Sequence, residues 1–139
     1  MKILTAVCVM ALLVIASAAW ADAPKRVKFT WSGGEAVAEL NGSQSAESLW
    51  AMLPVTVDFK DFNGVERIAY TEKELSAEGA PESCTPEAGT LALYAPWGNL
   101  SVFYKPFRES RGLVPLGRFV EGADKVSTLG EAVRIERME

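Results

Sequence analysis

The sequence contains no histidine and only two cysteines among its 139 residues. Histidine is the commonest general base near neutral pH and the commonest metal ligand, so its absence excludes Ser-His-Asp and Cys-His catalysis and histidine-ligated zinc or iron. The formal net charge of -4 argues against a nucleic-acid partner, because nucleic-acid binders normally present a basic surface. The glycines show no phosphate-loop pattern. We therefore expect no cofactor, no metal and no nucleic acid.

Residues 1–21 have the pattern of a secretory signal peptide. Lys2 precedes an apolar run over residues 3–20, which ends in the small-x-small triplet Ala19-Trp20-Ala21. The alternative is a retained membrane anchor, since the run approaches the roughly 20 residues that a spanning helix needs. The small residues at its end favour cleavage. We predict a signal peptide over 1–21, a single domain over 22–139, a periplasmic or secreted location, and no membrane association after cleavage.

Cleavage would leave Cys84 as the only thiol, so no disulfide is available within the domain. Its neighbours Glu82 and Glu87 would raise the pKa of the thiol and lower its reactivity. The carboxylates around it lack the alternation and the fixed glycine of a calcium-binding loop. We therefore interpret Cys84 as a structural residue in an acidic loop, although covalent dimerisation through it stays open.

Short alternating or apolar stretches predict seven or eight strands, which is typical of a β-barrel or sandwich. The stretches are 26–31, 35–40, 55–59, 68–70, 89–94, 99–104, 116–120 and 133–136. A short amphipathic helix is predicted over 45–53, stopped by Pro54, with single helical turns near 71–75 and 125–129. Because closure would remove exposed strand edges, we expect a mainly β fold, a closed barrel with two short helices.

The stretch from Gly89 to Tyr104 places Ala-Pro-Trp-Gly-Asn (95–99) between two apolar strands. It resembles the central motif of the prokaryotic cyclophilin-like fold proteins, and residues 112–118 resemble that family's second motif. Residues 46–54 and 66–70 are similar to its helix and to the segment that follows. The resemblance covers most of 26–137 and implies a small closed cyclophilin-like β-barrel with a helix at each end. It implies little about activity, because the family is poorly characterised.

Cyclophilin isomerases carry a catalytic arginine in a Phe-His-Arg context and a histidine in the pocket, and this chain has no histidine. Proline isomerisation itself needs only an apolar pocket and a donor to the twisted amide, which Arg118 or Arg67 could supply. The simpler interpretation is that the aromatics pack in the core and that Arg118 is a surface strand residue. We predict an exported, non-catalytic binding or accessory domain whose ligand is unknown, or a structural partner in an envelope assembly. The alternative is a peptidyl-prolyl cis-trans isomerase with a degenerate site.

Aromatic residues gather in sequence around the 95–98 turn, with basic residues close behind. Concave apolar sites are common at barrel mouths, so we expect these side chains to line such a mouth and to accept a peptide or a small anionic ligand. The candidate ligand-binding residues are Tyr94, Trp97, Asn99, Phe103, Phe107 and Arg118. The alternative is that these aromatics fill the barrel and the charges keep its outside soluble.

Overall fold

The computed structural model describes residues 23–139, in which eleven β-strands, one α-helix and one 3-10 turn follow one another. The elements are β1 (Arg26–Trp31), β2 (Gly34–Leu40), α1 (Gln44–Met52), β3 (Val55–Val57), β4 (Lys60–Phe62), β5 (Glu66–Tyr70), β6 (Ser83–Cys84), β7 (Thr90–Tyr94), β8 (Asn99–Phe103), β9 (Ser110–Arg111), β10 (Leu113–Glu121), η1 (Val126–Thr128) and β11 (Val133–Met138). The prediction of a mainly β fold is confirmed. The predicted signal peptide over 1–21 lies outside the described residues.

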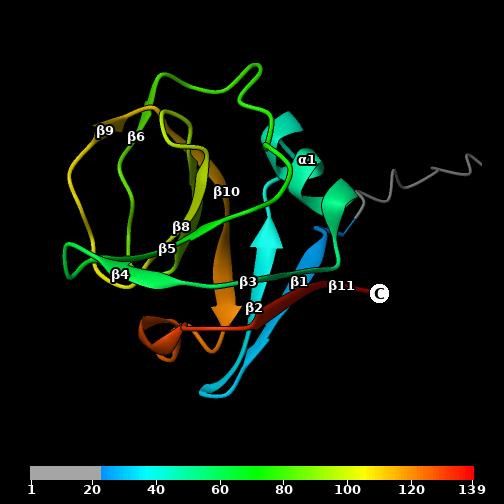
Figure 1. The fold of residues 1–139 in the computed structure, drawn as a ribbon. Coiled ribbons are helices and arrows are strands. Elements are labelled where there is room, and N and C mark those ends of the chain that lie inside the picture. The colour runs from blue at the N-terminus through cyan, green and yellow to red at the C-terminus, as the bar shows by residue number, and fades with distance from the viewer. Residues whose placement is uncertain (1–22) are drawn as a thin grey trace, which may run out of the picture.

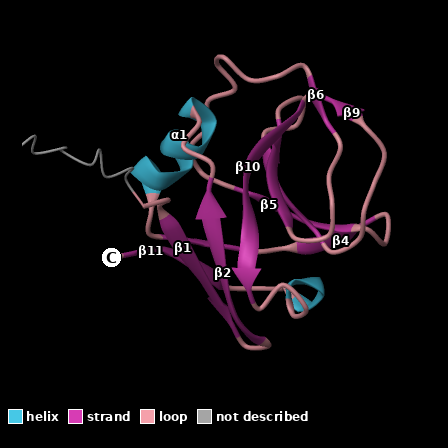
Figure 2. Ribbon diagram, turned by 180° about the vertical axis from the view of Figure 1, so that it is seen from behind, coloured by secondary structure: helices cyan, strands magenta, loops and turns pink. Residues whose placement is uncertain are grey.

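Nine strands form one antiparallel sheet in the order β3-β11-β1-β2-β10-β7-β8-β5-β4. The sheet curls strongly on itself, and α1 and η1 lie at its opposite ends (Figures 1 and 2). Among residues 23–139, no helix has the length and apolar character needed to cross a membrane.

The expectation of full closure is wrong, because β3 and β4 are the two edges of the sheet and do not pair with each other. They are instead consecutive in the chain, joined only by Asp58 and Phe59. The Phe59 amide donates to the Gly130 carbonyl at 2.8 Å, and the Asp58 carboxylate accepts from the Ala132 amide at 2.8 Å. No backbone ladder therefore closes the barrel between β3 and β4. The two strands are connected there by Asp58 and Phe59, which are held by hydrogen bonds to the segment before β11.

Local hydrogen bonds explain why helix α1 forms and why the helical turn predicted near 71–75 does not. The Ser43 hydroxyl accepts from the Ala46 amide at 3.1 Å as an N-cap, and α1 ends immediately before Leu53 and Pro54. The helical turn predicted near 71–75 is absent. There the Thr71 hydroxyl donates to the Lys73 carbonyl at 2.6 Å, which stabilises a bend rather than a helix start.

Two hydrophobic cores lie on opposite faces of the same strands. In β7, Leu91 and Leu93 belong to the main core inside the curled sheet, whereas Ala92 belongs to a second, smaller core. The same alternation occurs in β8 and in β10, because successive side chains of a strand point to opposite faces. Strands β6 and β9 form a separate two-stranded sheet, and Cys84 and Phe107 pack against the second core. All five residues of β8 are consequently buried.

Candidate functional site

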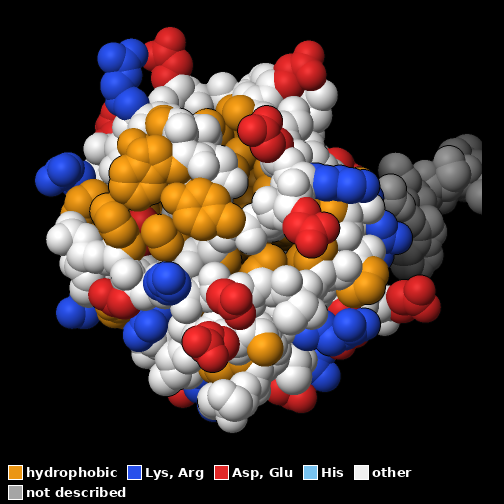
Figure 3. Space-filling view, in the orientation of Figure 1, with side chains coloured by type: hydrophobic (Ala, Val, Ile, Leu, Met, Phe, Trp, Pro, Cys, Tyr) orange, Lys and Arg blue, Asp and Glu red, His pale blue; other side chains and the backbone are white. Residues whose placement is uncertain are grey.

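A cavity of about 430 Å³ opens beside the second core, on the face of the sheet that points away from the main core. It lies between the β4–β5 hairpin, the β7–β8 turn and the segment over 107–113. Its lining residues are Phe62, Asn63, Val65, Glu66, Tyr94, Trp97, Phe103, Phe107, Arg108, Glu109, Ser110, Arg111 and Leu113. Figure 3 shows hydrophobic side chains gathered over this part of the molecule, at the left, with acidic atoms visible between them.

One cross-strand row runs along the cavity. In the strand register Glu66 of β5 pairs with Phe62 of β4 on one side and with Phe103 of β8 on the other. Paired residues of antiparallel strands present their side chains on the same face. Phe103 is buried and belongs to the second core, so the same face carries the Glu66 carboxyl into the cavity.

Three aromatic rings form a cluster in the lining. The Trp97 ring meets Phe62 edge-on at 5.4 Å between centroids and Tyr94 edge-on at 5.3 Å, with interplanar angles of 87° and 83°. Trp97 nevertheless keeps 51% of its surface exposed and Phe62 keeps 40%. Large aromatic side chains usually bury more than this, so a wall of half-exposed rings around a cavity is a feature of binding sites.

The Glu66 carboxyl is the most strongly perturbed acid in the site. Its partial burial raises its pKa to about 7, and the nearby negative charge of Asp61 adds to the shift. Within residues 23–139 its side chain has neither a hydrogen-bond partner nor an ion-pair partner. Because burial disfavours the ionised carboxyl, a ligand that donates a hydrogen bond or carries a positive charge would stabilise the ionised form.

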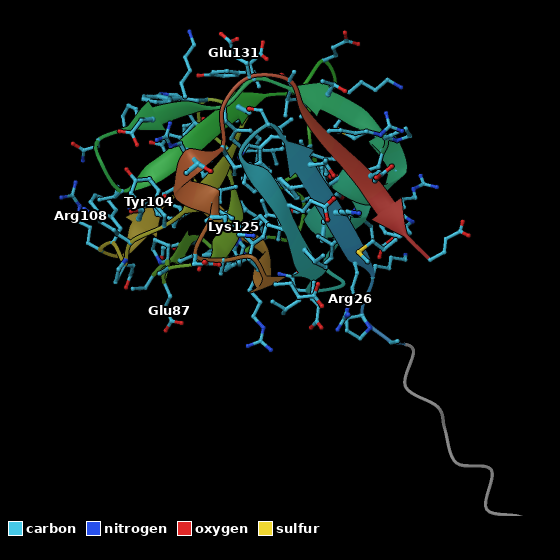
Figure 4. The ribbon with its side chains drawn as sticks, turned by 90° about the horizontal axis from the view of Figure 1, so that it is seen from below. Arg26, Glu87, Tyr104, Arg108, Lys125 and Glu131 are labelled. Atoms are coloured by element: carbon cyan, nitrogen blue, oxygen red, sulfur yellow. The ribbon has the colours of Figure 1, made fainter. Side chains whose placement is uncertain are left out.

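The rim of the cavity carries charged residues of both signs, and each of them contacts another side chain. Arg111 lies 3.6 Å from Glu82, with both side chains more than four-fifths exposed. The guanidinium of Arg108 stands over the Phe107 ring at 4.8 Å, and Arg108 projects from the edge of the molecule in Figure 4. Glu109 accepts from the Ser83 hydroxyl at 2.9 Å. Glu66 therefore differs from the rim charges in both burial and partners.

On the other face of the β4–β5 hairpin, the Tyr104 hydroxyl donates to the Asp61 carboxylate at 2.5 Å. Arg67 lies 3.6 Å from that carboxylate and 6.0 Å from the Tyr104 ring centroid. The Tyr104 hydrogen bond is the main cause that lowers the Asp61 pKa, and it raises the pKa of Tyr104. Arg67 does not line the cavity, so its place in the proposed isomerase site has no support from this geometry.

The structure brings four of the six predicted site residues together. Tyr94, Trp97, Phe103 and Phe107 all line the cavity. Asn99 is buried instead, and its amide donates to the Leu100 carbonyl and the Ser101 hydroxyl at 3.0 Å each. Arg118 is exposed on β10 and does not line the cavity. The cavity also differs in place from the expected barrel mouth, because the second core separates it from the barrel interior.

Phe62 and Glu66, which contribute an aromatic wall and the carboxyl, were not among the predicted site residues. The Asn63-Gly64 pair between them is typical of a tight turn, and a tight turn between two strands makes the flanking residues cross-strand neighbours. Both turn residues have positive φ angles, 58° and 67°. The pairing of Phe62 with Glu66 follows from that turn.

Cys84 is partly buried against the second core, and this burial raises the pKa of its thiol. A raised thiol pKa lowers the thiolate fraction, which is the reactive form. No group of three or more acidic or cysteine side chains suited to a metal ion occurs within residues 23–139.

Residues 29–136 match the sequence profile of the cyclophilin-like family. The chain belongs to the cyclophilin-like family. This membership confirms the resemblance to that family noted in the sequence. The fold of this cyclophilin-like protein is similar to the solution structure of a hypothetical protein from Archaeoglobus fulgidus, with a TM-score of 0.64 and 19% identity over 86% of this chain and 99% of that chain. At that identity the likeness concerns the fold alone. No curated protein matches the chain.

Proposed function

We propose that this cyclophilin-like protein is a non-catalytic binding or accessory domain and that its ligand occupies the aromatic cavity. A volume of about 430 Å³ suits a small molecule or one to two side chains of a peptide. The lining combines aromatic rings with a small number of polar groups, as is usual for ligand pockets. The observation that carries the proposal is the unpartnered Glu66 carboxyl on the row between two phenylalanines.

Binding at the cavity can be tested with simple aromatic probes and two variants. Benzylamine, benzyl alcohol and benzoate would each be titrated into the isotope-labelled protein, and the indole N–H signal of Trp97 would be followed by NMR. We expect at least one probe to shift that signal at saturable concentrations. Trp97→Ala should abolish the binding of that probe, whereas Tyr70→Ala should not.

Tyr70 is a matched control because it is 59% exposed on β5 and does not line the cavity. Equal losses of affinity in the two variants would indicate nonspecific association with exposed aromatics. No saturable shift with any of the three probes would contradict the proposed function.

The alternative function, a peptidyl-prolyl isomerase, now has different candidate residues. The arginines that line the aromatic cavity are Arg108 and Arg111, whereas Arg67 and Arg118 do not line it. An isomerase using this cavity would speed cis-trans exchange of an X-Pro peptide, measured by NMR exchange, and would lose that acceleration in Arg108→Ala or Arg111→Ala. Acceleration that depends on either arginine would replace the non-catalytic proposal.

We also propose that the domain acts in the periplasm or outside the cell. The basis is the charge and hydropathy pattern of residues 1–21 in the sequence. The intact mass of exported protein should lack these residues. An exported chain that retains them would contradict cleavage.

A further inference from the structure

Asp61, Glu109 and Arg111 around Glu66 have hydrogen-bond or ion-pair partners, Arg108 contacts only the Phe107 ring, and Glu66 has neither kind of partner within residues 23–139. Asp61, on the neighbouring strand β4, is held by Tyr104 and Arg67 on the opposite face of the hairpin. The segment over 107–113 contributes Arg108, Glu109 and Arg111, whose contacts with Phe107, Ser83 and Glu82 are described above. From β7 only the Tyr94 hydroxyl is titratable in the lining. Among the described residues that line the cavity, Glu66 is thus the carboxyl without a side-chain partner, whereas Glu109 already accepts one hydrogen bond.

The rim arginines would favour an anionic ligand, but their influence inside the cavity is smaller. Arg111 is 86% exposed, so solvent and salt screen its charge. Arg108 lies over the Phe107 ring at the edge of the molecule. Glu66 is half-buried on an apolar row, where the lower effective dielectric strengthens its interaction with a charge of opposite sign. Charge complementarity inside the cavity therefore favours a cation.

The aromatic rings favour the same class of ligand. Trp97 stands perpendicular to both Phe62 and Tyr94, so rings of different orientation border one space. The electron-rich faces of aromatic rings attract organic cations, and several rings around one site bind quaternary or methylated ammonium groups well. A carboxylate beside such rings supplies the counter-charge.

We propose that the cavity binds a small organic ammonium ion, with Glu66 as its counter-ion and the rings of Phe62, Tyr94 and Trp97 as its walls. This inference rests on the proposed binding function and names the class of ligand. The cation binds when Glu66 is ionised, and the proton that Glu66 held in the free protein leaves to the buffer. Near pH 7 part of the free molecules carry that proton, so binding releases a fraction of a proton per ligand.

The test compares probes that share a benzyl group and differ in charge. Benzyltrimethylammonium, benzyl alcohol and benzoate would be titrated by calorimetry and NMR at one pH unit above 7 and two units below it. Above pH 7 we expect the ammonium probe to bind about tenfold more tightly than benzyl alcohol. That advantage should disappear at the lower pH, where Glu66 is protonated. Near pH 7, titrations in buffers of different ionisation enthalpy should show the proton release.

Glu66→Gln keeps the size of the side chain and removes its charge. It should lower the affinity for benzyltrimethylammonium about tenfold and abolish the pH dependence of that affinity, with a smaller effect on benzyl alcohol. Glu82→Gln is the matched control, because Glu82 is a rim carboxylate outside the cavity lining. A separate titration uses Nα-acetyl-lysine amide as a model of a lysine side chain from a protein partner. If it binds more tightly than benzyltrimethylammonium, the ligand is such a side chain, and if it binds more weakly, the ligand is a free cation.

The failures of the two proposals are distinguishable. If benzoate or benzyl alcohol shifts Trp97 and the ammonium probe binds no more tightly, the cation proposal is overturned and the binding function stands. Unchanged ammonium affinity in Glu66→Gln would also overturn it. If no probe shifts Trp97, both proposals fail.

Discussion

The two faces of strand β8 belong to two differently packed regions. Leu100 and Val102 point into the main core, where both are fully buried. Phe103 points the other way, into a core of only three buried residues that borders an open cavity. The difference shows that one strand can be fixed by close packing on one face and can present unfilled space on the other. The filled face should therefore determine stability, and the open face should determine binding.

The largest expected effect is a difference in stability loss between two alanine variants, one at an aromatic residue of each region. Phe29 is fully buried in the main core and meets Phe119 edge-on at 4.9 Å. Phe29→Ala should lower the free energy of unfolding by about 3–5 kcal/mol. Trp97→Ala should lower it by only about 1 kcal/mol, because Trp97 is half exposed. Urea denaturation followed by circular dichroism would measure both, and equal losses would contradict the division of roles.

Two glycines with nearly the same φ angle allow the free space around the backbone to be compared at two positions. Gly122 has φ of 68°, and a Cβ there would lie 2.4 Å from the Glu35 carbonyl oxygen. Gly98, in the β7–β8 turn beside the cavity, has φ of 73° and no atom within 4 Å of such a Cβ. Gly98→Ala should cost about 1 kcal/mol of stability from backbone strain alone. Gly122→Ala should cost about 2–4 kcal/mol, since a backbone clash adds to the strain.

Equal losses in these two glycine variants would show that the backbone around Gly122 relaxes freely. The same urea denaturation would decide between the outcomes.

Glu66→Gln tests the cavity through its pH dependence. The folded-state pKa of about 7 lies above the reference value of 4.5, so the folded protein binds the proton more tightly than the unfolded chain. The contribution of Glu66 to stability is then fully present below pH 4.5 and is lost as the pH rises through 7.

Above pH 7 Glu66→Gln should therefore be more stable than the native protein by about 1 kcal/mol, a figure reduced because the carboxyl is only partly buried and solvent screens its charge. Below pH 4.5 the two proteins should match. Denaturation across this range would measure the difference, with Glu82→Gln, at a carboxylate outside the cavity lining, as the control variant. A constant difference at every pH would contradict the assignment.

The smallest effect concerns Asp61, on the other face of the same hairpin. The Tyr104 hydroxyl is the main cause that lowers the Asp61 pKa. In Tyr104→Phe that pKa should rise toward its ordinary value, as measured by carboxyl carbon NMR titration. An unchanged Asp61 titration would show that the backbone amide of Gly64 or the charge of Arg67 dominates instead.

Strands whose side chains alternate or are uniformly apolar could be predicted from the sequence. Strands that form only by pairing with distant segments could not. The strand predicted over 26–31 is β1, and the one predicted over 99–104 is β8, which ends one residue earlier at Phe103. Strand β4 is Lys-Asp-Phe with all three residues exposed, so it has no apolar pattern to detect. Strands β6 and β9 have two residues each and are defined only by pairing with each other.

The candidate site was predictable where its residues are neighbours in the chain. Tyr94 and Trp97 flank one turn, and their clustering in sequence became a contact in space. Glu66 pairs with Phe62 across a local turn, but its place beside Phe103 and the second core depends on pairing with β8, a strand more than thirty residues away in the sequence. Arg118 and Asn99 were placed in the site by closeness in sequence or by analogy of function, and the strand geometry directs them elsewhere.

The position of β11 in the sheet determines when this fold can be completed during synthesis. β11 lies between β1 and β3, and it pairs Ile135 with Phe29 on one side and with Val55 on the other. A chain made from its N-terminus can form the β1–β2 hairpin early, since that hairpin is local. The two ladders that join this hairpin to β3 form only when residues 133–138 have been added. Within residues 23–139 the first and the last strand are thus neighbours, and a nascent chain that stops at residue 132 lacks the strand that joins β1 to β3.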